Sequence, residues 1–108
     1  HHLLPQGRLR YFQARGFPKR DIDNFCIEVS ALDHDMIHGG NQRLARIRWR
    51  EKEWNTRLFD RLDQAEELLR EATGNPKARL SREEILDLME SQRREFQLGD
   101  HPLVKYHD

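Results

Sequence analysis

The sequence contains one cysteine, Cys26, which excludes a disulfide framework and a zinc site built from several thiolates. No apolar run approaches the roughly 20 residues that a membrane-spanning helix needs, and no signal-peptide pattern is present. Net charge is also absent, since 19 Lys and Arg balance 19 Asp and Glu. Any metal ion in this chain would therefore be held by histidine, carboxylate and water.

The zero net charge hides an asymmetry between the two halves of the chain. Residues 1–57 contain 11 Lys and Arg against 7 Asp and Glu, a balance of +4, whereas residues 58–108 contain 8 against 12, a balance of −4. The basic half also carries four of the 6 histidines, as a phosphate-binding site would require. The alternative interpretation is two solvated helical faces of opposite charge.

At 108 residues, the chain has the size of one domain with a modest core. In its first part, residues 3–5 are expected to end a short strand, 5–16 to form a helix and 21–24 to form a turn. Residues 25–29 are rich in aromatic and β-branched side chains, which predicts a second strand, and residues 31–38 suit a short helix. The β element is therefore expected to be small.

The second half predicts two longer helices. The first runs from about residue 49 to 74, because an apolar stripe recurs at steps of three and four through Trp54, Leu58, Leu62, Ala65 and Leu69. Ser81 and Glu84 form a capping box that opens the second, which is expected to end near Gly99 and to be followed by an extended tail. The predicted fold is mainly α with a small β element.

Two pairs of histidines carry the chemistry. His34 and His38 are four residues apart, so on a helix both imidazoles share one face and can grip one metal ion. His1 and His2 are adjacent, so on an extended segment their side chains point in opposite directions. One of them can then complete the metal site while the other acts as a base on substrate. The carbonyl of Asn24, before the second strand, can orient that base.

This order of parts is that of a ββα-metal nuclease site. Three segments carry the similarity: His1-His2-Leu3-Leu4-Pro5-Gln6, Ile22-Asp23-Asn24-Phe25, and the stretch from Asp33 to Gly40. Together they resemble the HNH/endonuclease-VII (His-Me finger) superfamily of bacterial toxin nucleases, and in particular the C-terminal module of lipoprotein toxins exchanged by contact between swarming bacteria. The motif match covers roughly residues 1–60.

The resemblance implies a single toxin nuclease domain, with a ββα-metal catalytic part over residues 1–48 and a helical part over 49–108. It implies that His2 is the general base and that Asn24 orients it. It also implies one divalent ion, whether Zn, Ni, Mg or Mn, on three ligands: His1, His34 and His38. The basic side chains expected to contact phosphate are Arg8, Arg10, Arg43, Arg46, Arg48 and Arg50.

The expected function is a metal-dependent endonuclease toxin that hydrolyses phosphodiester bonds, with DNA favoured over RNA, by a one-metal, His general-base mechanism. The expected partners are nucleic acid and a cognate immunity protein, and this domain is expected to make no membrane contact. We expect it to be delivered or secreted and to act in the cytoplasm of a target cell, as one piece of a longer protein that is a lipoprotein.

Other interpretations of the same residues remain open at this point. The main alternative is a non-catalytic module in which a histidine-bound zinc staples a small fold that binds a protein partner. A terminal His-His can also be the remnant of a purification tag. His34 and His38 can be a solvent-facing pair on a helix, and Asn24 can be a simple turn residue.

Overall fold

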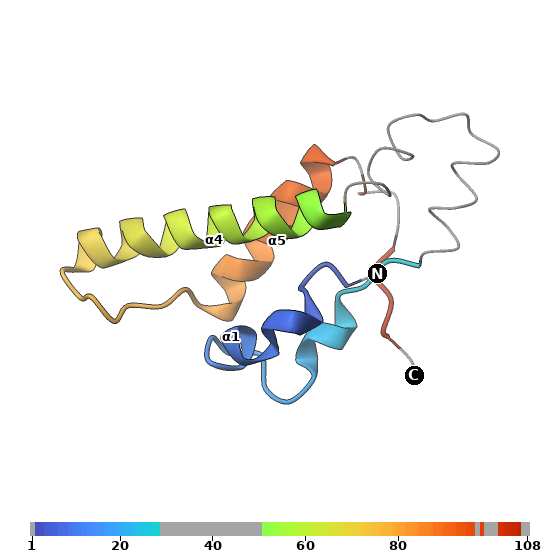
Figure 1. Cartoon of the computed structure of the whole chain (residues 1–108). Coiled ribbons are helices and arrows are strands. Elements are labelled where there is room, and N and C mark those ends of the chain that lie inside the picture. Colours follow the sequence, from blue (N-terminus) through green and yellow to red (C-terminus); the bar gives the residue numbers. More distant parts are fainter. Residues whose placement is uncertain (1, 29–50, 97, 99–101, 107–108) are drawn as a thin grey trace.

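The computed structural model describes residues 2–28, 51–96, 98 and 102–106, and within the long helix it describes side chains from Trp54 onward. The described part is mainly helical, as the sequence predicted (Figure 1). Its elements are η1 (Gln6–Arg8), α1 (Leu9–Gln13), η2 (Asp21–Asn24), α4 (Glu51–Thr73) and α5 (Arg82–Glu95). None of the described helices is long and apolar enough to cross a membrane.

Helices α4 and α5 pack along their predicted apolar stripes (Figure 1). Trp54, Leu58 and Leu62 of α4 are buried, and so are Ile85 and Met89 of α5. The turn after α4 begins at Gly74, whose φ of +68° is a left-handed conformation that glycine adopts without strain. The capping box is confirmed, because the Ser81 side chain accepts from Glu84 N and the Glu84 side chain accepts from Ser81 N.

Helix α5 ends earlier than the sequence predicted. Its last residue is Glu95 rather than one near Gly99, and Phe96 is the C-cap. The amide of Leu98 donates to the carbonyl of Arg93 at 2.9 Å, a bond across six residues that closes helix C-termini. Leu98 is fully buried. Burial of its side chain favours a chain that turns back to the core at this point over a helix that continues to Gly99.

The N-terminal part packs as short helical turns alongside α4, from Trp54, which contacts Leu3, to Glu66, which contacts Arg15 (Figure 1). Three N-terminal side chains are buried in the same core as the apolar side chains of α4 and α5. They are Phe12 of α1, Phe17 of the loop that follows, and Ile22 of η2. The segment 21–24, predicted as a turn, is a 3-10 helix. This difference is small, because a 3-10 helix is a succession of tight turns.

The β structure in the described residues is limited to two isolated bridges. Cys26 pairs in antiparallel fashion with His2 on one side and with Val104 on the other. Of the strand predicted over 25–29, residues 25–28 are described and carry only these bridges, so a ββα core is not shown. The predicted helix over 31–38 and the boundary between residues 48 and 49 lie outside the described residues.

A buried carboxylate ties three segments together. Glu66 of α4 is 6% exposed and accepts two hydrogen bonds from the Arg15 guanidinium, at 2.7 and 2.9 Å. It also accepts from Arg70 at 2.7 Å and from the amide of Leu80 at 3.1 Å. The hydrogen bond from Arg15 is the main cause that lowers the pKa of Glu66, against desolvation, which raises it. Glu66 thereby links the segment after α1 to α4 and to the loop before α5.

We predict that Glu66→Gln destabilises the protein by about 3 kcal/mol, because removing one charge of a buried pair leaves the other uncompensated. A carboxylate whose pKa is lowered on folding stabilises the folded state above its unfolded pKa, and that stabilisation is lost as the pH falls through the lower folded value. The difference between wild type and Glu66→Gln should therefore shrink in acid. Urea unfolding between pH 3 and 7 tests this, with Glu67→Gln on the exposed face as the control. A difference that stays constant with pH would contradict it.

Candidate functional site

The backbone next to His2 is held at Leu3 by two hydrogen bonds, one to α4 and one to the chain after η2. The indole Nε1 of Trp54 donates to the carbonyl of Leu3 at 3.0 Å, and the Leu3 amide donates to the carbonyl of Phe25 at 2.9 Å. Gln92 of α5 in turn donates to the carbonyl of Trp54 at 2.9 Å. Leu3 is fully buried. The segment that carries His2 is thus fixed to α4 and to the chain after η2.

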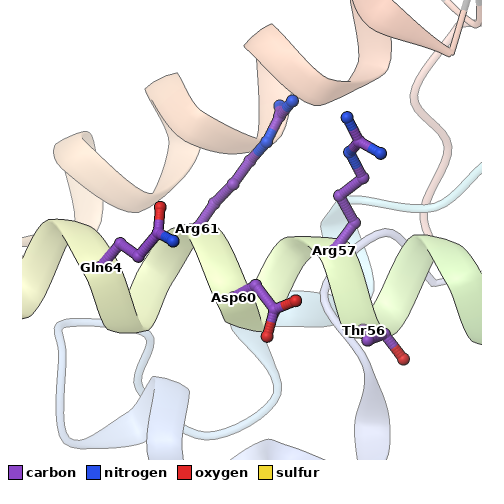
Figure 2. Close-up of a pocket in the computed structure, with 5 residues that line it drawn as sticks. All are labelled: Thr56, Arg57, Asp60, Arg61 and Gln64. Atoms are coloured by element: carbon purple, nitrogen blue, oxygen red, sulfur yellow. The ribbon is translucent and has the colours of Figure 1, made fainter.

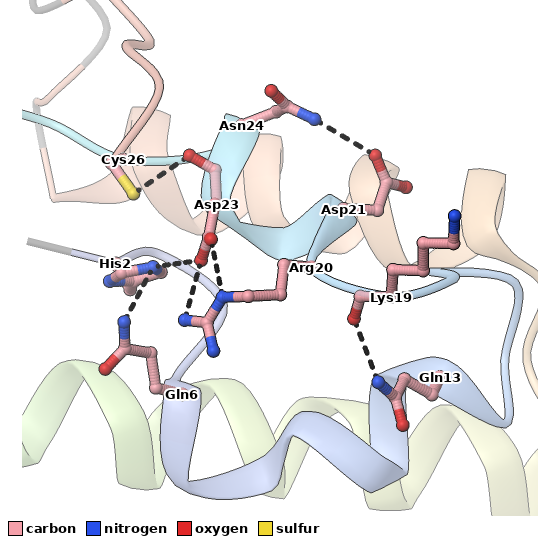
Figure 3. A network of polar contacts seen from close by, with 9 residues as sticks. All are labelled: His2, Gln6, Gln13, Lys19, Arg20, Asp21, Asp23, Asn24 and Cys26. Atoms are coloured by element: carbon pink, nitrogen blue, oxygen red, sulfur yellow. Dashed lines mark hydrogen bonds and ion pairs between the residues drawn. The ribbon is translucent and has the colours of Figure 1, made fainter. Parts of the chain in front are cut away.

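The His2 imidazole contacts a carboxylate. Its Nε2 lies 2.9 Å from Oδ1 of Asp23 in η2, and the two side chains are only 10% and 11% exposed (Figure 3). An ionised carboxylate can only accept, so the proton of this contact belongs to Nε2. In the neutral imidazole, the lone pair is then on Nδ1. The contact with Asp23 therefore selects the nitrogen that is able to act as a base.

Asp23 is kept ionised by a neighbouring arginine. Arg20 Nε donates to Asp23 Oδ2 at 2.7 Å, and its Nη2 donates to Oδ1 at 3.2 Å. The hydrogen bond from Arg20 is the main cause that lowers the pKa of Asp23; desolvation raises it, and the hydrogen bond with His2 lowers it further. An anionic Asp23 holds the imidazole in one tautomer and stabilises the imidazolium that forms when the ring takes a proton.

Two further side chains surround the imidazole. The amide nitrogen of Gln6 lies 3.3 Å from His2 Nε2, a longer contact than the one to Asp23 (Figure 3). The ring of Tyr106 lies against the His2 ring with centroids 4.8 Å apart. Because Nε2 already faces the anionic Asp23, that shorter contact decides the tautomer. The arrangement is a mostly buried histidine with a polar and an aromatic neighbour.

Asn24 does not contact His2 in this structure. Its side chain is exposed, and its amide donates to Oδ1 of Asp21 at 3.2 Å, away from the imidazole (Figure 3). The neighbouring Asp23 occupies the position that the resemblance implied for Asn24. The geometry therefore assigns the orientation of His2 to a carboxylate rather than to an amide.

The other predicted site residues divide into two groups. Arg8 and Arg10 are exposed, and the Arg8 guanidinium lies 4.7 Å above the centre of the Phe59 ring, beside an open groove of about 510 Å³. Such a cation–π contact leaves the charge available to an anion at the surface. The remaining residues lie outside the described part of the chain: His1, His34, His38, Arg43, Arg46, Arg48 and Arg50.

A second open groove, of about 360 Å³, lies along α4 and is lined by Thr56, Arg57, Asp60, Arg61 and Gln64 (Figure 2). Arg57 and Arg61 extend toward α5, where both form ion pairs with Glu95. Because their charges are balanced by this carboxylate, these arginines offer less to a phosphate than Arg8 and Arg10 do.

Sequence reasoning missed Asp23, Arg20 and Tyr106. Asp23 and Arg20 are three residues apart, a spacing at which side chains meet in a 3-10 turn, so the ion pair was detectable in principle. The contact of Asp23 with His2 spans 21 residues, and no local pattern indicates it. Tyr106 is farther still from His2 in the sequence.

Among the described residues, no group of three or more His, Cys, Asp or Glu side chains gathers in a way that suits a metal ion. His2 and Asp23 meet as a pair. The three predicted ligands all lie outside the described ranges.

Comparisons of the chain with protein-family models, with curated proteins and with solved structures found no match. The nuclease superfamily therefore rests on the motif resemblance, and the chemistry of the site has to be argued from its own residues.

We predict that Asp23→Asn impairs any reaction that uses His2 as a base more than Asn24→Ala does. The asparagine amide no longer selects the Nε2–H tautomer and no longer stabilises an imidazolium, which should cost about a hundredfold or more in rate. Nucleic-acid cleavage measured for both variants tests this. A larger loss with Asn24→Ala would instead support the assignment implied by the resemblance.

Proposed function

We propose that this chain is a metal-dependent endonuclease toxin domain that hydrolyses phosphodiester bonds of nucleic acid, with DNA favoured over RNA. The observation that carries the proposal is the His2–Asp23 contact, because it leaves the lone pair of the neutral imidazole on Nδ1, at the position where the motif expects a general base. The basic first half of the chain supports a phosphate-rich substrate.

In the proposed reaction, Nδ1 of His2 takes a proton from a water molecule, and the oxygen of that water attacks the phosphorus. The P–O bond to the leaving oxygen breaks, and that oxygen acquires a proton from solvent. Asp23 stabilises the imidazolium meanwhile, and Arg20 keeps Asp23 anionic. The described side chains of this chain thus supply the base and its support.

The proposal places a divalent ion on His1, His34 and His38. Three imidazoles with an open position form a donor set that suits a catalytic metal site, with Zn, Ni, Mg and Mn all still to be tested. When bound, the ion would supply charge neutralisation at the scissile phosphate and at the leaving oxygen.

The path of the chain is compatible with this ligand set. His1 immediately precedes His2, and Cys26, which pairs with His2, is followed eight residues later by His34. Eight extended residues span at most about 28 Å, and this upper limit on the distance from Cys26 to His34 leaves the proposed ligand set possible. A ββα-metal core over residues 1–48 is part of the proposal on the basis of the motif resemblance.

The biological setting of the proposal follows from the resemblance alone. The domain would be delivered or secreted as part of a longer lipoprotein and would act in the cytoplasm of a target cell. A producer would need a cognate immunity protein. The exposed arginines Arg8 and Arg10, together with Arg43, Arg46, Arg48 and Arg50, are the proposed phosphate contacts.

The test is cleavage of plasmid DNA and of total RNA by the purified chain across divalent ions, with EDTA as the metal-free control. We expect His2→Ala to abolish cleavage while bound metal is retained, because the base is lost and the ligands remain. We expect His38→Ala to lose both cleavage and metal. His101→Ala, a histidine outside the motif, is the matched control and should cleave like wild type.

Full cleavage by His2→Ala would overturn the assignment of the base. If folded protein binds zinc stoichiometrically and cuts neither DNA nor RNA, the nuclease proposal fails, and the non-catalytic zinc-stapled interaction module becomes the better description.

A further inference from the structure

The C-terminal segment 102–106 packs directly on the elements that form the His2 site (Figure 1). Val104 and Cys26 exchange both of their backbone hydrogen bonds, at 2.8 and 3.2 Å. Two residues later, the amide of Tyr106 donates to the carbonyl of Asp23 at 2.7 Å. Three backbone hydrogen bonds therefore fix the last described residues of the chain to the residues that hold His2.

This anchoring places an aromatic ring on the imidazole. The Tyr106 and His2 rings lie with centroids 4.8 Å apart and planes inclined by 50°. Tyr106 is 39% exposed, whereas the side chain of His2 is 10% exposed. Tyr106 thus lies at the surface with its ring against the imidazole of the mostly buried His2.

We propose that Tyr106 is a positioning residue that aims the His2 imidazole through this ring contact, an inference that rests on the proposed role of His2 as the base. The ring is held at Cγ by its covalent bond to Cβ and at Nε2 by Asp23, which leaves it free to rotate about the line through these two atoms. Packing against Tyr106 removes this freedom and fixes the plane of the ring, and thereby the direction of Nδ1.

The proposal gives the last described segment of the chain a role in the site. Asp23 is the common support, because its carboxylate contacts His2 and its carbonyl accepts from Tyr106 N. Movement of segment 102–106 would therefore disturb both sides of the imidazole together. General-base catalysis is sensitive to such displacement, since an error of about 1 Å can cost about a hundredfold in rate.

The test compares Tyr106→Ala, Tyr106→Leu and Tyr106→Phe in the full chain, with Lys105→Ala as a neighbouring exposed control. Tyr106→Phe keeps the ring and should cleave within about twofold of wild type, whereas Tyr106→Ala and Tyr106→Leu should lower kcat about tenfold with KM within about twofold. Tyr106→Leu keeps an apolar side chain of similar size, so a lower kcat in this variant would not result from loss of the fold. Thermal melting of each variant checks that it is folded.

A second readout is independent of cleavage. In metal-free protein, the ¹⁵N resonances of the His2 ring should report the Nε2–H tautomer in wild type and in each Tyr106 variant, because Asp23 is unchanged. The ring resonances should broaden through exchange between orientations in Tyr106→Leu, and stay sharp in wild type and Tyr106→Phe. Unchanged kcat and unchanged ring signals in folded Tyr106→Leu would overturn the proposal. A loss in Tyr106→Phe equal to that in Tyr106→Ala would also overturn it, because the hydroxyl rather than the ring would then be responsible.

The two readouts separate this proposal from the proposed function. If wild type cleaves no nucleic acid but the ring signals change as expected, the nuclease role of His2 fails while its contact with Tyr106 stands. If wild type cleaves and Tyr106→Leu behaves like wild type in both assays, the nuclease proposal stands and the positioning role fails.

Discussion

The hydrogen bond from the indole of Trp54 to the carbonyl of Leu3 is the constraint on which the site depends. Trp54 is 1% exposed and packs edge-on against Phe96, so its position is set by the contact between α4 and α5. A buried carbonyl without a partner would cost about 1–3 kcal/mol, and the indole supplies that partner one residue from His2. The helical core thereby determines where the histidine lies.

The site is assembled from irregular segments that the helices hold in place. His2 lies just before η1, Asp23 lies within η2, and Tyr106 lies in the C-terminal segment; the three meet around the bridges of Cys26. No continuous strand in the described residues supports them. Backbone hydrogen bonds at Leu3, Cys26 and Tyr106 hold these segments together instead.

Two buried carboxylates use the same physics for different purposes. Glu66 and Asp23 both have pKa values lowered chiefly by an arginine that bonds them. Glu66 accepts from the side chains of Arg15 and Arg70 and from the amide of Leu80, so its charge joins segments of the chain. Asp23 instead divides its oxygens between Arg20 and the imidazole of His2, so it is the carboxylate that joins the candidate site.

The sequence alone determined the helical class, the apolar stripes of α4 and α5 and the capping box at Ser81, because each is a local pattern. Only the tertiary structure decided that Asp23 rather than Asn24 faces His2, that Tyr106 covers the imidazole, and that α5 ends at Glu95. The first two contacts join residues far apart in the chain. The choice between Asp23 and Asn24 also depends on which of two adjacent side chains in η2 points toward His2. Side-chain periodicity carries no information about such long-range pairing, since it reports burial on one element and not the partner across the core.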